Sequence, residues 1–270
     1  MPGTNLALNR IKYIFHRLSG KRFLVARSEP YDLEMKFLIR DGSCKDVYYK
    51  QGVYGEDYIN KWLTSNLDIN NDDLIIDIGA NVGWYSLVLT RDTKPTILAF
   101  EPDKTNFDLL TENIRRNKRT TVKAYNKAVS DKEGTLTLYL YKGYNPGRHS
   151  FIRQKNSIGT AEVPIVPLDG FLNKEGFGQR NVKLVKIDIE GYEYTALKAA
   201  KQLLSRTEYI LTEFSPYLMR DIGQEPFDYI NLLQEAGFKL REITETGLHK
   251  PDFEKIIAEN RQVNLLGSKR

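Results

Sequence analysis

Residues 74–84 read Leu-Ile-Ile-Asp-Ile-Gly-Ala-Asn-Val-Gly-Trp, an apolar run that meets an acid and two glycines before a helical pattern begins. A short apolar run bounded by glycine is typical of a buried parallel strand. Gly79 and Gly83 allow a tight turn and let a ligand approach a helix N-terminus closely. Asp77 stands near the carboxyl end of the strand, where ligands bind in open α/β sheets. The stretch therefore predicts a ligand site on a strand–turn–helix unit.

The composition of the 270-residue chain is that of an ordinary globular protein, with 41% hydrophobic and 28% charged residues. A formal net charge of +5 is too small by itself to indicate a nucleic-acid partner. Cys44 is the single cysteine, which excludes an intrachain disulfide and favours a reducing compartment. Because no segment has the pattern of a membrane span or a signal peptide, we expect a cytoplasmic protein.

The N-terminal segment predicts a basic amphipathic helix. Its apolar residues share one helical face and are Leu8, Ile11, Phe15 and Leu18. The basic residues around that face are Arg10, Lys12, Arg17, Lys21 and Arg22. We expect the apolar face to pack on the protein's own domain. The alternative is peripheral contact with an anionic membrane surface through residues 8–22.

Strands and helices alternate along the chain from residue 74 onward. The expected strands are 74–78, 96–101, 121–129, 182–188 and 209–213, and the expected helices are 83–90, 105–117, 194–204 and 227–236. Residues 238–243 and 262–266 add a final antiparallel pair. This alternation predicts an α/β fold with a doubly wound, mostly parallel seven-stranded sheet.

Two parts of the chain lie outside this alternation. Residues 1–70, with an expected strand at 36–40 and an expected helix at 56–67, form an N-terminal extension that packs on a core domain of residues 71–270. Residues 135–140 and 161–166 are extended pieces of an inserted hairpin, and the loop between them is rich in glycine and turn residues. Insertions of this kind usually build a substrate site or a lid.

Four of the expected strands end in acids, which are Asp77, Glu101, Asp188 and Glu213. A single such acid often caps a helix, but four on one sheet edge, above a glycine turn, favour a ligand site. Glu101 can accept hydrogen bonds from both hydroxyls of a ribose, and Asp77 can attract a cationic group. The pocket suits a sulfonium cofactor better than a dinucleotide, because the glycine spacing departs from the G-x-G-x-x-G fingerprint.

Three motifs resemble those of FkbM-type S-adenosylmethionine-dependent methyltransferases: residues 76–83 (Ile-Asp-Ile-Gly-Ala-Asn-Val-Gly), 100–102 (Phe-Glu-Pro) and 186–193 (Lys-Ile-Asp-Ile-Glu-Gly-Tyr-Glu). The loop Asn145-Pro146-Gly147-x-x-Ser150 adds to the resemblance, which spans about residues 74–266. It implies a class I, Rossmann-like fold and methyl transfer to oxygen, most often to a sugar hydroxyl of a glycan, glycolipid or glycosylated metabolite. A carbohydrate-containing acceptor is thus the expected partner.

The same resemblance implies which residues bind S-adenosylmethionine. They would be Asp77, Gly79, Ala80, Asn81, Gly83, Glu101, Pro102, Ala128, Val129 and Asp188. Ala128 and Val129 would flank the adenine, and Asp188 would lie where the methionine end meets the acceptor.

A sugar hydroxyl is a poor nucleophile, so its methylation needs alignment and a base that takes the proton. The candidates are His149 in the inserted loop and the acids Asp188, Glu190 and Glu213. The acids could instead hold Mg²⁺. We do not favour a metal, because Phe214 stands where related sugar methyltransferases carry the second member of an acidic pair.

Other function classes remain as alternatives. A nucleic-acid methyltransferase is favoured only by the basic charge, since residues 188–191 read Asp-Ile-Glu-Gly and lack the Asn/Asp-Pro-Pro-aromatic element of amino methyltransferases. A non-catalytic membrane-surface module that retains the fold is a second alternative, and a nicotinamide oxidoreductase fits least. The sequence leaves the acceptor and the oligomeric state open.

Overall fold

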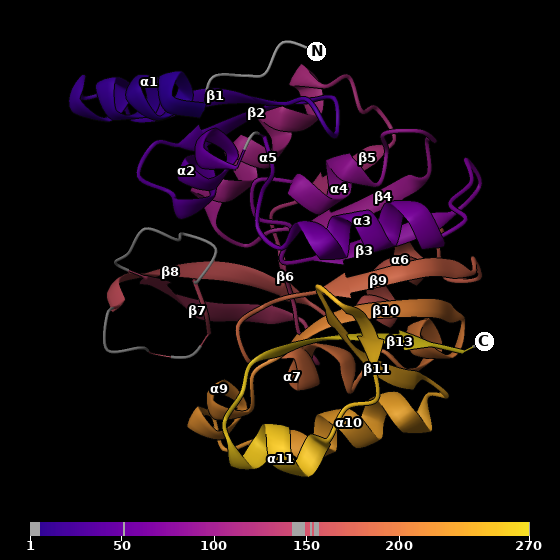
Figure 1. The fold of residues 1–270 in the computed structure, drawn as a ribbon. Coiled ribbons are helices and arrows are strands. Elements are labelled where there is room, and N and C mark those ends of the chain that lie inside the picture. The colour runs from indigo at the N-terminus through magenta and orange to yellow at the C-terminus, as the bar shows by residue number, and fades with distance from the viewer. Residues whose placement is uncertain (1–5, 51, 142–148, 152, 154–156, 270) are drawn as a thin grey trace.

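The computed structural model describes residues 6–50, 52–141, 149–151, 153 and 157–269. A sheet of eight strands lies at the centre of this part of the chain (Figure 1). Its strands are β3 (Leu74–Ile78), β4 (Thr96–Phe100), β5 (Val122–Tyr125), β9 (Val182–Ile187), β10 (Thr207–Phe214), β11 (Lys239–Thr244), β12 (Gly247–His249) and β13 (Val263–Ser268). Their order is β12-β11-β13-β10-β9-β3-β4-β5.

The sheet is mostly parallel, as expected. The five neighbouring strands β5, β4, β3, β9 and β10 run parallel to one another. On the far side of β10, the strands β13, β11 and β12 each pair antiparallel with their neighbours. The expected antiparallel pair near the C-terminus is confirmed, with Leu240 opposite Gly267. The three-residue strand β12 makes the sheet one strand wider than the seven predicted, because the polar segment after β11 turns back and pairs with it.

Helices cover both faces of the sheet (Figure 1). One face carries α3 (Asp57–Asn66), α4 (Trp84–Val88) and α5 (Lys104–Arg116). The other carries α6 (Leu168–Lys174), α7 (Glu193–Leu197), α8 (Lys201–Ser205), α9 (Pro216–Asp221), α10 (Pro226–Glu235) and α11 (Phe253–Ala258). Side chains along β3 alternate between these layers, since Ile76 packs in one core cluster and Ile75 in the other. The fold is therefore the doubly wound α/β sandwich that the alternation predicts.

The expected strand at 121–129 is two strands in two different sheets. After β5, the Asn126 side chain donates hydrogen bonds to the carbonyl oxygens of Glu101 and Pro102, both 2.9 Å away. The chain turns there, and β6 (Ala128–Val129) leaves the central sheet. It pairs with β8 (Ser157–Val166), which in turn pairs with β7 (Gly134–Tyr141). These last two strands form the inserted hairpin, and Asn145, Pro146 and Gly147 at its tip lie outside the described residues.

The expected helix at 194–204 is likewise two short helices, α7 and α8. The side chain of Asp169 on α6 accepts hydrogen bonds from the backbone N–H groups of Gln202 and Leu203, at the start of α8. These are amides that no residue inside the helix can satisfy. Asp169, 33 residues before Gln202, therefore stabilises the start of a second helix that the local sequence does not predict.

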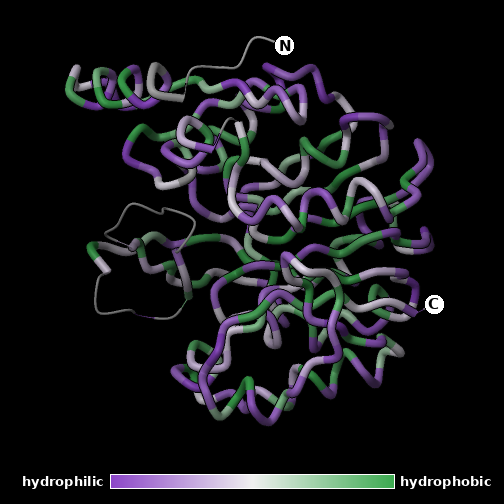
Figure 2. The backbone as a smooth tube through the Cα atoms, viewed as in Figure 1, coloured by the Kyte–Doolittle hydropathy of each residue, from purple (hydrophilic) through white to green (hydrophobic). Residues whose placement is uncertain are grey.

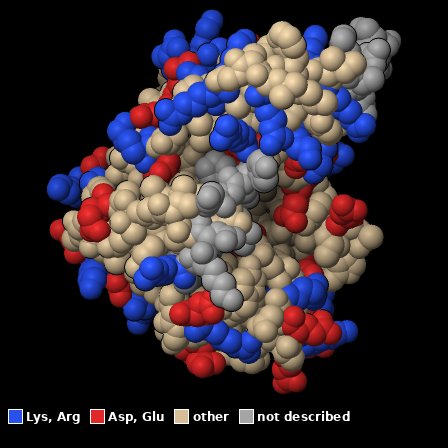
Figure 3. All heavy atoms as spheres, turned by 90° about the vertical axis from the view of Figure 1, so that its left-hand side faces the viewer, with Lys and Arg blue, Asp and Glu red and all other residues tan. Residues whose placement is uncertain are grey.

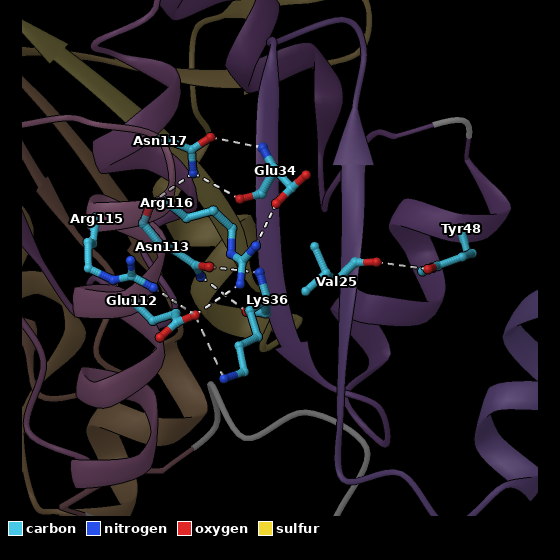
Figure 4. Close-up of polar contacts among 9 residues, drawn as sticks. All are labelled: Val25, Glu34, Lys36, Tyr48, Glu112, Asn113, Arg115, Arg116 and Asn117. Atoms are coloured by element: carbon cyan, nitrogen blue, oxygen red, sulfur yellow. Dashed lines mark hydrogen bonds and ion pairs between the residues drawn. The ribbon is translucent and has the colours of Figure 1, made fainter.

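The N-terminal extension holds a two-stranded sheet of β1 (Phe23–Ser28) and β2 (Leu33–Leu38), with α2 (Gly42–Tyr49) beside it. Asn113 on α5 accepts from the Lys36 N–H over 2.7 Å and donates to the Lys36 carbonyl oxygen (Figure 4). It also donates to the carbonyl oxygen of Val82. Asn117, one helical turn later, makes the same pair of bonds with Glu34. Two amide side chains thus pair with β2 as a neighbouring strand would. The division of the chain at residue 70 stays a prediction.

The predicted N-terminal helix is present as α1 (Leu6–Leu18), but its expected packing is wrong. Ile11, Phe15 and Leu18 are 62, 68 and 82% exposed, and Figure 2 shows hydrophobic segments along this helix at the edge of the molecule. The side chain of Leu8 lies outside what the structure describes. Tyr13, on the opposite side, is the buried residue. Among the described residues, none of the helices combines the length and apolarity that a membrane crossing requires.

Candidate active site

The turn after β3 is held against the end of the neighbouring strand. The N–H groups of Gly79 and Ala80 both donate to the carbonyl oxygen of Phe100, each over 3.0 Å. Gly79 and Asn81 adopt left-handed backbone conformations, with φ of 77° and 50°. A Cβ on Gly79 would lie 2.0 Å from the carbonyl oxygen of Asp188, so only glycine fits there. The sequence around residue 79 thus lets the ends of β3, β4 and β9 converge.

A cavity of about 570 Å³ opens above this turn. Its lining includes the expected residues Gly79, Ala80, Asn81, Glu101, Pro102, His149, Asp188, Glu190 and Glu213. Three of the four strand-terminal acids, Glu101, Asp188 and Glu213, therefore lie on a single concave surface. Its volume lies in the range typical of small-molecule sites.

Glu101, at the end of β4, is fixed on the cavity wall by the backbone. One carboxylate oxygen accepts from the Asn81 N–H over 2.8 Å and the other from the Asp103 N–H over 2.9 Å. Burial raises the pKa of Glu101 to about 8, against the effect of these two hydrogen bonds. Each oxygen keeps a second lone pair, so the fixed carboxyl can still accept two donors from a ligand.

Asp77 lies beneath the cavity rather than in its lining. It is buried, accepts a hydrogen bond from the Ser86 hydroxyl over 2.6 Å, and lies 3.6 Å from the ammonium nitrogen of Lys186. That ammonium also lies 3.8 Å from Asp188 and donates to the Gly79 carbonyl oxygen. Asp77 therefore acts on the turn through Lys186.

The acids Asp188, Glu190 and Glu213 form what we call the carboxylate cluster. Each offers an oxygen, and these oxygens all lie within 4.8 Å of one another, which is a spacing that could hold one metal ion. Burial, and then repulsion from Asp188, Glu190 and Glu193, raise the pKa of Glu213 well above its usual value. A carboxylate with a raised pKa accepts a proton more strongly than a free one. The cluster can therefore take up a proton or bind a cation.

Glu193 holds the loop that carries this cluster. One of its oxygens accepts from the N–H groups of Ile189 and Gly191 over 2.9 and 3.3 Å. Glu190, between them, has a φ of 55°, which is uncommon for a residue with a side chain. The Ser150 hydroxyl, from the segment between β7 and β8, donates to the Glu190 carbonyl oxygen. Glu193 and Ser150 thus position Glu190 from two sides.

His149 lies in the cavity wall beside Asp103, where its Nε2 is 3.9 Å from an Asp103 oxygen. Its Nδ1 accepts a hydrogen bond from the Tyr141 N–H over 2.9 Å. Burial lowers the pKa of His149, against the opposing effect of Asp103, which favours the neutral ring with its proton on Nε2. Neither ring nitrogen then has a free lone pair. This geometry favours the carboxylate cluster over His149 as the base.

Besides Asp77, three expected cofactor residues lie outside the cavity lining: Gly83, Ala128 and Val129. Ala128 and Val129 are buried in β6, and Val129 packs in the core beneath the sheet. Gly83 immediately precedes α4 as its N-cap with a φ of 93°, and a Cβ there would lie 2.6 Å from Leu110 on α5. The structure therefore gives Gly83 a role in helix packing, and the adenine role of Ala128 and Val129 stays a prediction.

Sequence reasoning missed several residues that line the cavity. Glu56 comes from the N-terminal extension, Tyr217 from α9, and Gln262 from the residue before β13. None stands near a motif, because long-range folding brings them to the edge of the sheet. Lys186 also lines the cavity, and for this residue the sequence does contain a signal. It is a charged residue inside an apolar strand that ends beside two acids.

Asn81 Oδ1 and Glu213 Oε2 are buried oxygens of the cavity wall that have no hydrogen-bond partner among the described residues. An unpaired buried acceptor is costly, so both favour a ligand that brings donors. The lining also carries five acids (Glu56, Glu101, Asp188, Glu190 and Glu213) against one lysine, Lys186. A cationic ligand with hydroxyl and ammonium donors fits this surface, and a diphosphate does not.

One family model and several known methyltransferases match this chain. The model of the methyltransferase FkbM domain matches residues 77–240. The hexuronic acid methyltransferase AglP of Haloferax volcanii is 25% identical over 72% of this chain and 74% of its own length. Methyltransferase sdnD of Sordaria araneosa is 29% identical over 63% of this chain, and the match spans 59% of sdnD. The 2-O-methyltransferase NoeI of Sinorhizobium fredii is 26% identical over 57% of this chain and 68% of its own length.

The matched segment begins at Asp77, at the glycine turn, and extends past Glu213 into β11. It therefore contains the turn, Glu101 and the whole carboxylate cluster, and it covers more than half of the chain. The protein belongs to the FkbM methyltransferase family and is a methyltransferase.

Proposed function

We propose that this chain transfers a methyl group from S-adenosylmethionine to a hydroxyl of a sugar, in a glycan, glycolipid or glycosylated metabolite. The observation that carries the proposal is that Glu101 and the carboxylate cluster line the same cavity. Glu101 suits the two ribose hydroxyls of a nucleoside, and the cluster suits a proton-releasing acceptor. Two relatives named for sugar or 2-O-methylation, AglP and NoeI, support a carbohydrate acceptor.

The residues of this chain would divide the work between binding and proton transfer. When bound, S-adenosylmethionine supplies an electrophilic methyl group on a positively charged sulfur. The acidic lining attracts that charge, and Glu101 and Asn81 offer acceptors to the cofactor's hydroxyl and ammonium donors. The acceptor oxygen gains the methyl group and its proton passes to the carboxylate cluster, with Glu213 as the strongest acceptor because its pKa is raised.

The charge of the cavity favours a neutral acceptor over an anionic one. Like charges repel more strongly in a buried site than in water. The excess of acids over lysine in the lining disfavours a nucleic-acid phosphate backbone, and it disfavours a uronate carboxylate relative to a hydroxyl. A nucleic-acid methyltransferase is therefore the weaker proposal.

Cofactor choice is tested by calorimetry with S-adenosylmethionine, S-adenosylhomocysteine and NAD. We expect the first two to bind the wild type and to bind Glu101→Gln about ten- to a hundredfold more weakly. The amide nitrogen of glutamine cannot accept a hydrogen bond from a ribose hydroxyl, and a buried donor left unsatisfied costs about 1–3 kcal/mol. Glu133→Gln is the control, because Glu133 is exposed and lies one residue before β7. It should bind the cofactor like the wild type. Binding of NAD without binding of S-adenosylmethionine would refute the proposal.

The acceptor and the base are tested together by screening neutral sugars, uronates and oligonucleotides for release of S-adenosylhomocysteine. With the acceptor found, Glu213→Gln should lower kcat about a hundredfold or more and leave cofactor affinity within a few-fold. His149→Asn should retain most of the activity. Full activity of Glu213→Gln would remove Glu213 from the role of base.

The spacing of the carboxylate cluster also favours a second candidate, a divalent cation held by Asp188, Glu190 and Glu213. Such a cation would orient the acceptor oxygen and lower the pKa of its hydroxyl. Activity that survives exhaustive chelation would rule it out. Activity that is lost and then restored by Mg²⁺ would replace the general-base role of the cluster.

A further inference from the structure

Helix α1 is attached to the molecule by one side. Tyr13 is buried, donates a hydrogen bond from its hydroxyl to the Ile39 carbonyl oxygen over 3.0 Å, and packs against the rings of Tyr48 and Tyr49, each 5.8 Å away. Successive residues of an α-helix are rotated by about 100°. Ile11, Phe15 and Leu18 therefore lie on the side opposite Tyr13.

That opposite side is apolar and exposed. Ile14 lies beside it and is 48% exposed, so four large apolar side chains of one short helix face away from the core. Single exposed apolar residues are common on soluble proteins, but a contiguous group of them marks an interaction surface. Something apolar is expected to cover this face.

A second feature lies at the C-terminal end of the same helix. A cavity of about 390 Å³ is lined by four basic residues and one acid: Arg17, Lys21, Arg22, Arg40 and Asp41. Among the described residues, no ion pair to an acid involves Lys12, Lys21, Arg22 or Arg40. Figure 3 looks onto this side of the molecule and shows Lys and Arg gathered across its upper part, with uncharged atoms between them.

The first 28 residues of the chain carry six lysines and arginines (Arg10, Lys12, Arg17, Lys21, Arg22 and Arg27) and no acid. An exposed apolar face rimmed by cations matches the interface of an anionic bilayer, where acyl chains lie beneath a layer of negative headgroups. A second copy of the chain is a poorer match, because a symmetric contact would bring two basic surfaces together. Nucleic acid would leave the apolar face uncovered.

We propose that α1 lies on the surface of an anionic phospholipid bilayer, with Ile11, Phe15 and Leu18 in the outer acyl layer and a headgroup phosphate in the basic cavity. The phosphate would be held by Lys21, Arg22 and Arg40. The methyltransferase cavity is lined by other residues, so this surface is independent of the methyl-transfer site.

The test is flotation of the full chain with vesicles of phosphatidylcholine alone and of phosphatidylcholine with about one-third phosphatidylglycerol. We expect binding to the mixed vesicles that weakens with salt, and about tenfold less binding to the neutral ones. Phe15→Ser/Leu18→Ser and Lys21→Glu/Arg22→Glu should each lower the affinity for mixed vesicles at least about tenfold. These side chains of α1 are exposed, so the first variant should keep its fold.

Matched controls change the same residue types elsewhere. Phe227→Ser removes an exposed aromatic ring from α10, and Lys132→Glu/Lys250→Glu reverses two exposed charges. Both should bind like the wild type. Equal binding to neutral and anionic vesicles, or loss of binding in the controls, would overturn the proposal. So would a concentration-dependent dimer in sedimentation velocity that Phe15→Ser/Leu18→Ser dissolves, since it would assign the apolar face to a second copy.

Discussion

The ammonium group of Lys186 on β9 donates a hydrogen bond to the carbonyl oxygen of Gly79, 2.9 Å away at the end of the neighbouring strand. The same nitrogen lies 3.6 Å from Asp77 and 3.8 Å from Asp188. Burial alone would lower the pKa of Lys186, but the surrounding carboxylates of Asp77, Asp188, Glu213 and Glu101 raise it above its usual value. One buried cation therefore joins the glycine turn to the carboxylate cluster.

Replacement of Lys186 by methionine should destabilise the protein strongly. The change leaves Asp77 buried without its cation, and breaking a buried pair from one side costs about 3–5 kcal/mol. Urea unfolding should show this loss. Lys183→Met is the control, because Lys183 lies on the same strand and pairs with the partly exposed Glu208 over 3.2 Å. We expect Lys183→Met to lose about 1 kcal/mol of the free energy of unfolding. Equal losses in the two variants would contradict the buried pairing of Lys186 with Asp77.

The stability of the ligand-free protein should fall as pH rises through the range set by Glu101. The folded chain keeps a proton on Glu101 up to about pH 8, whereas the unfolded chain releases it near its usual pKa of 4.5. Stability from this group is therefore complete below about pH 4.5 and lost by about pH 8, a change on the order of a few kcal/mol.

Melting temperatures measured across this range give the test of Glu101. Glu101→Gln should flatten the fall. It should leave a smaller slope from Glu193, whose pKa burial raises to about 7. Glu133→Gln, at an exposed position, should keep the wild-type slope. A wild-type stability that rises steadily from pH 5 to 8 would show that these carboxyls are not buried as described.

Alanine at Gly79 should cost much more than alanine at Gly176, although both glycines have nearly the same φ, 77° and 80°. The shared left-handed conformation costs about 1 kcal/mol in each variant. A Cβ on Gly176 would meet nothing within 4 Å, but on Gly79 it would lie 2.0 Å from the Asp188 carbonyl oxygen. The difference between the two free energies of unfolding measures how tightly β3 and β9 converge, and similar values would contradict that contact.

Alanine substitutions at Asn113 and Asn117 should have separable effects on the backbone of β2. Hydrogen–deuterium exchange of Asn113→Ala should lose protection at the Lys36 amide and keep it at Glu34, and Asn117→Ala should do the reverse. Asn113→Ala should also cost more stability, on the order of 2–4 kcal/mol, because Asn113 is fully buried and serves three backbone groups. If each variant lost protection at both the Lys36 and the Glu34 amide, β2 would detach as a unit.

The sequence predicts the central sheet and the glycine turn well, because both depend on local patterns. The apolar runs of β3, β4 and β9 and the glycines after residue 78 fix the strands, the turn and the sheet edge where the acids meet. Membership of the family is confirmed on the same residues.

Most of what the sequence does not predict depends on contacts between distant residues. Asn126 turns the chain out of the central sheet, Asp169 starts α8, and Asn113 stands in for a strand beside β2. An amphipathic pattern also does not say which side a helix buries. Tyr13, with one hydrogen bond and two ring contacts, anchors α1 in place of its more apolar face.

The amide side chains along β2 have a consequence for solubility. A two-stranded sheet has two open edges, and each unpaired edge is a template on which another chain can add a strand. Asn113 and Asn117 occupy the N–H and C=O groups of Lys36 and Glu34 on one of them. The helix that supports the glycine turn thereby also shields this edge from intermolecular strand pairing, so damage to it would favour aggregation before the central sheet unfolds.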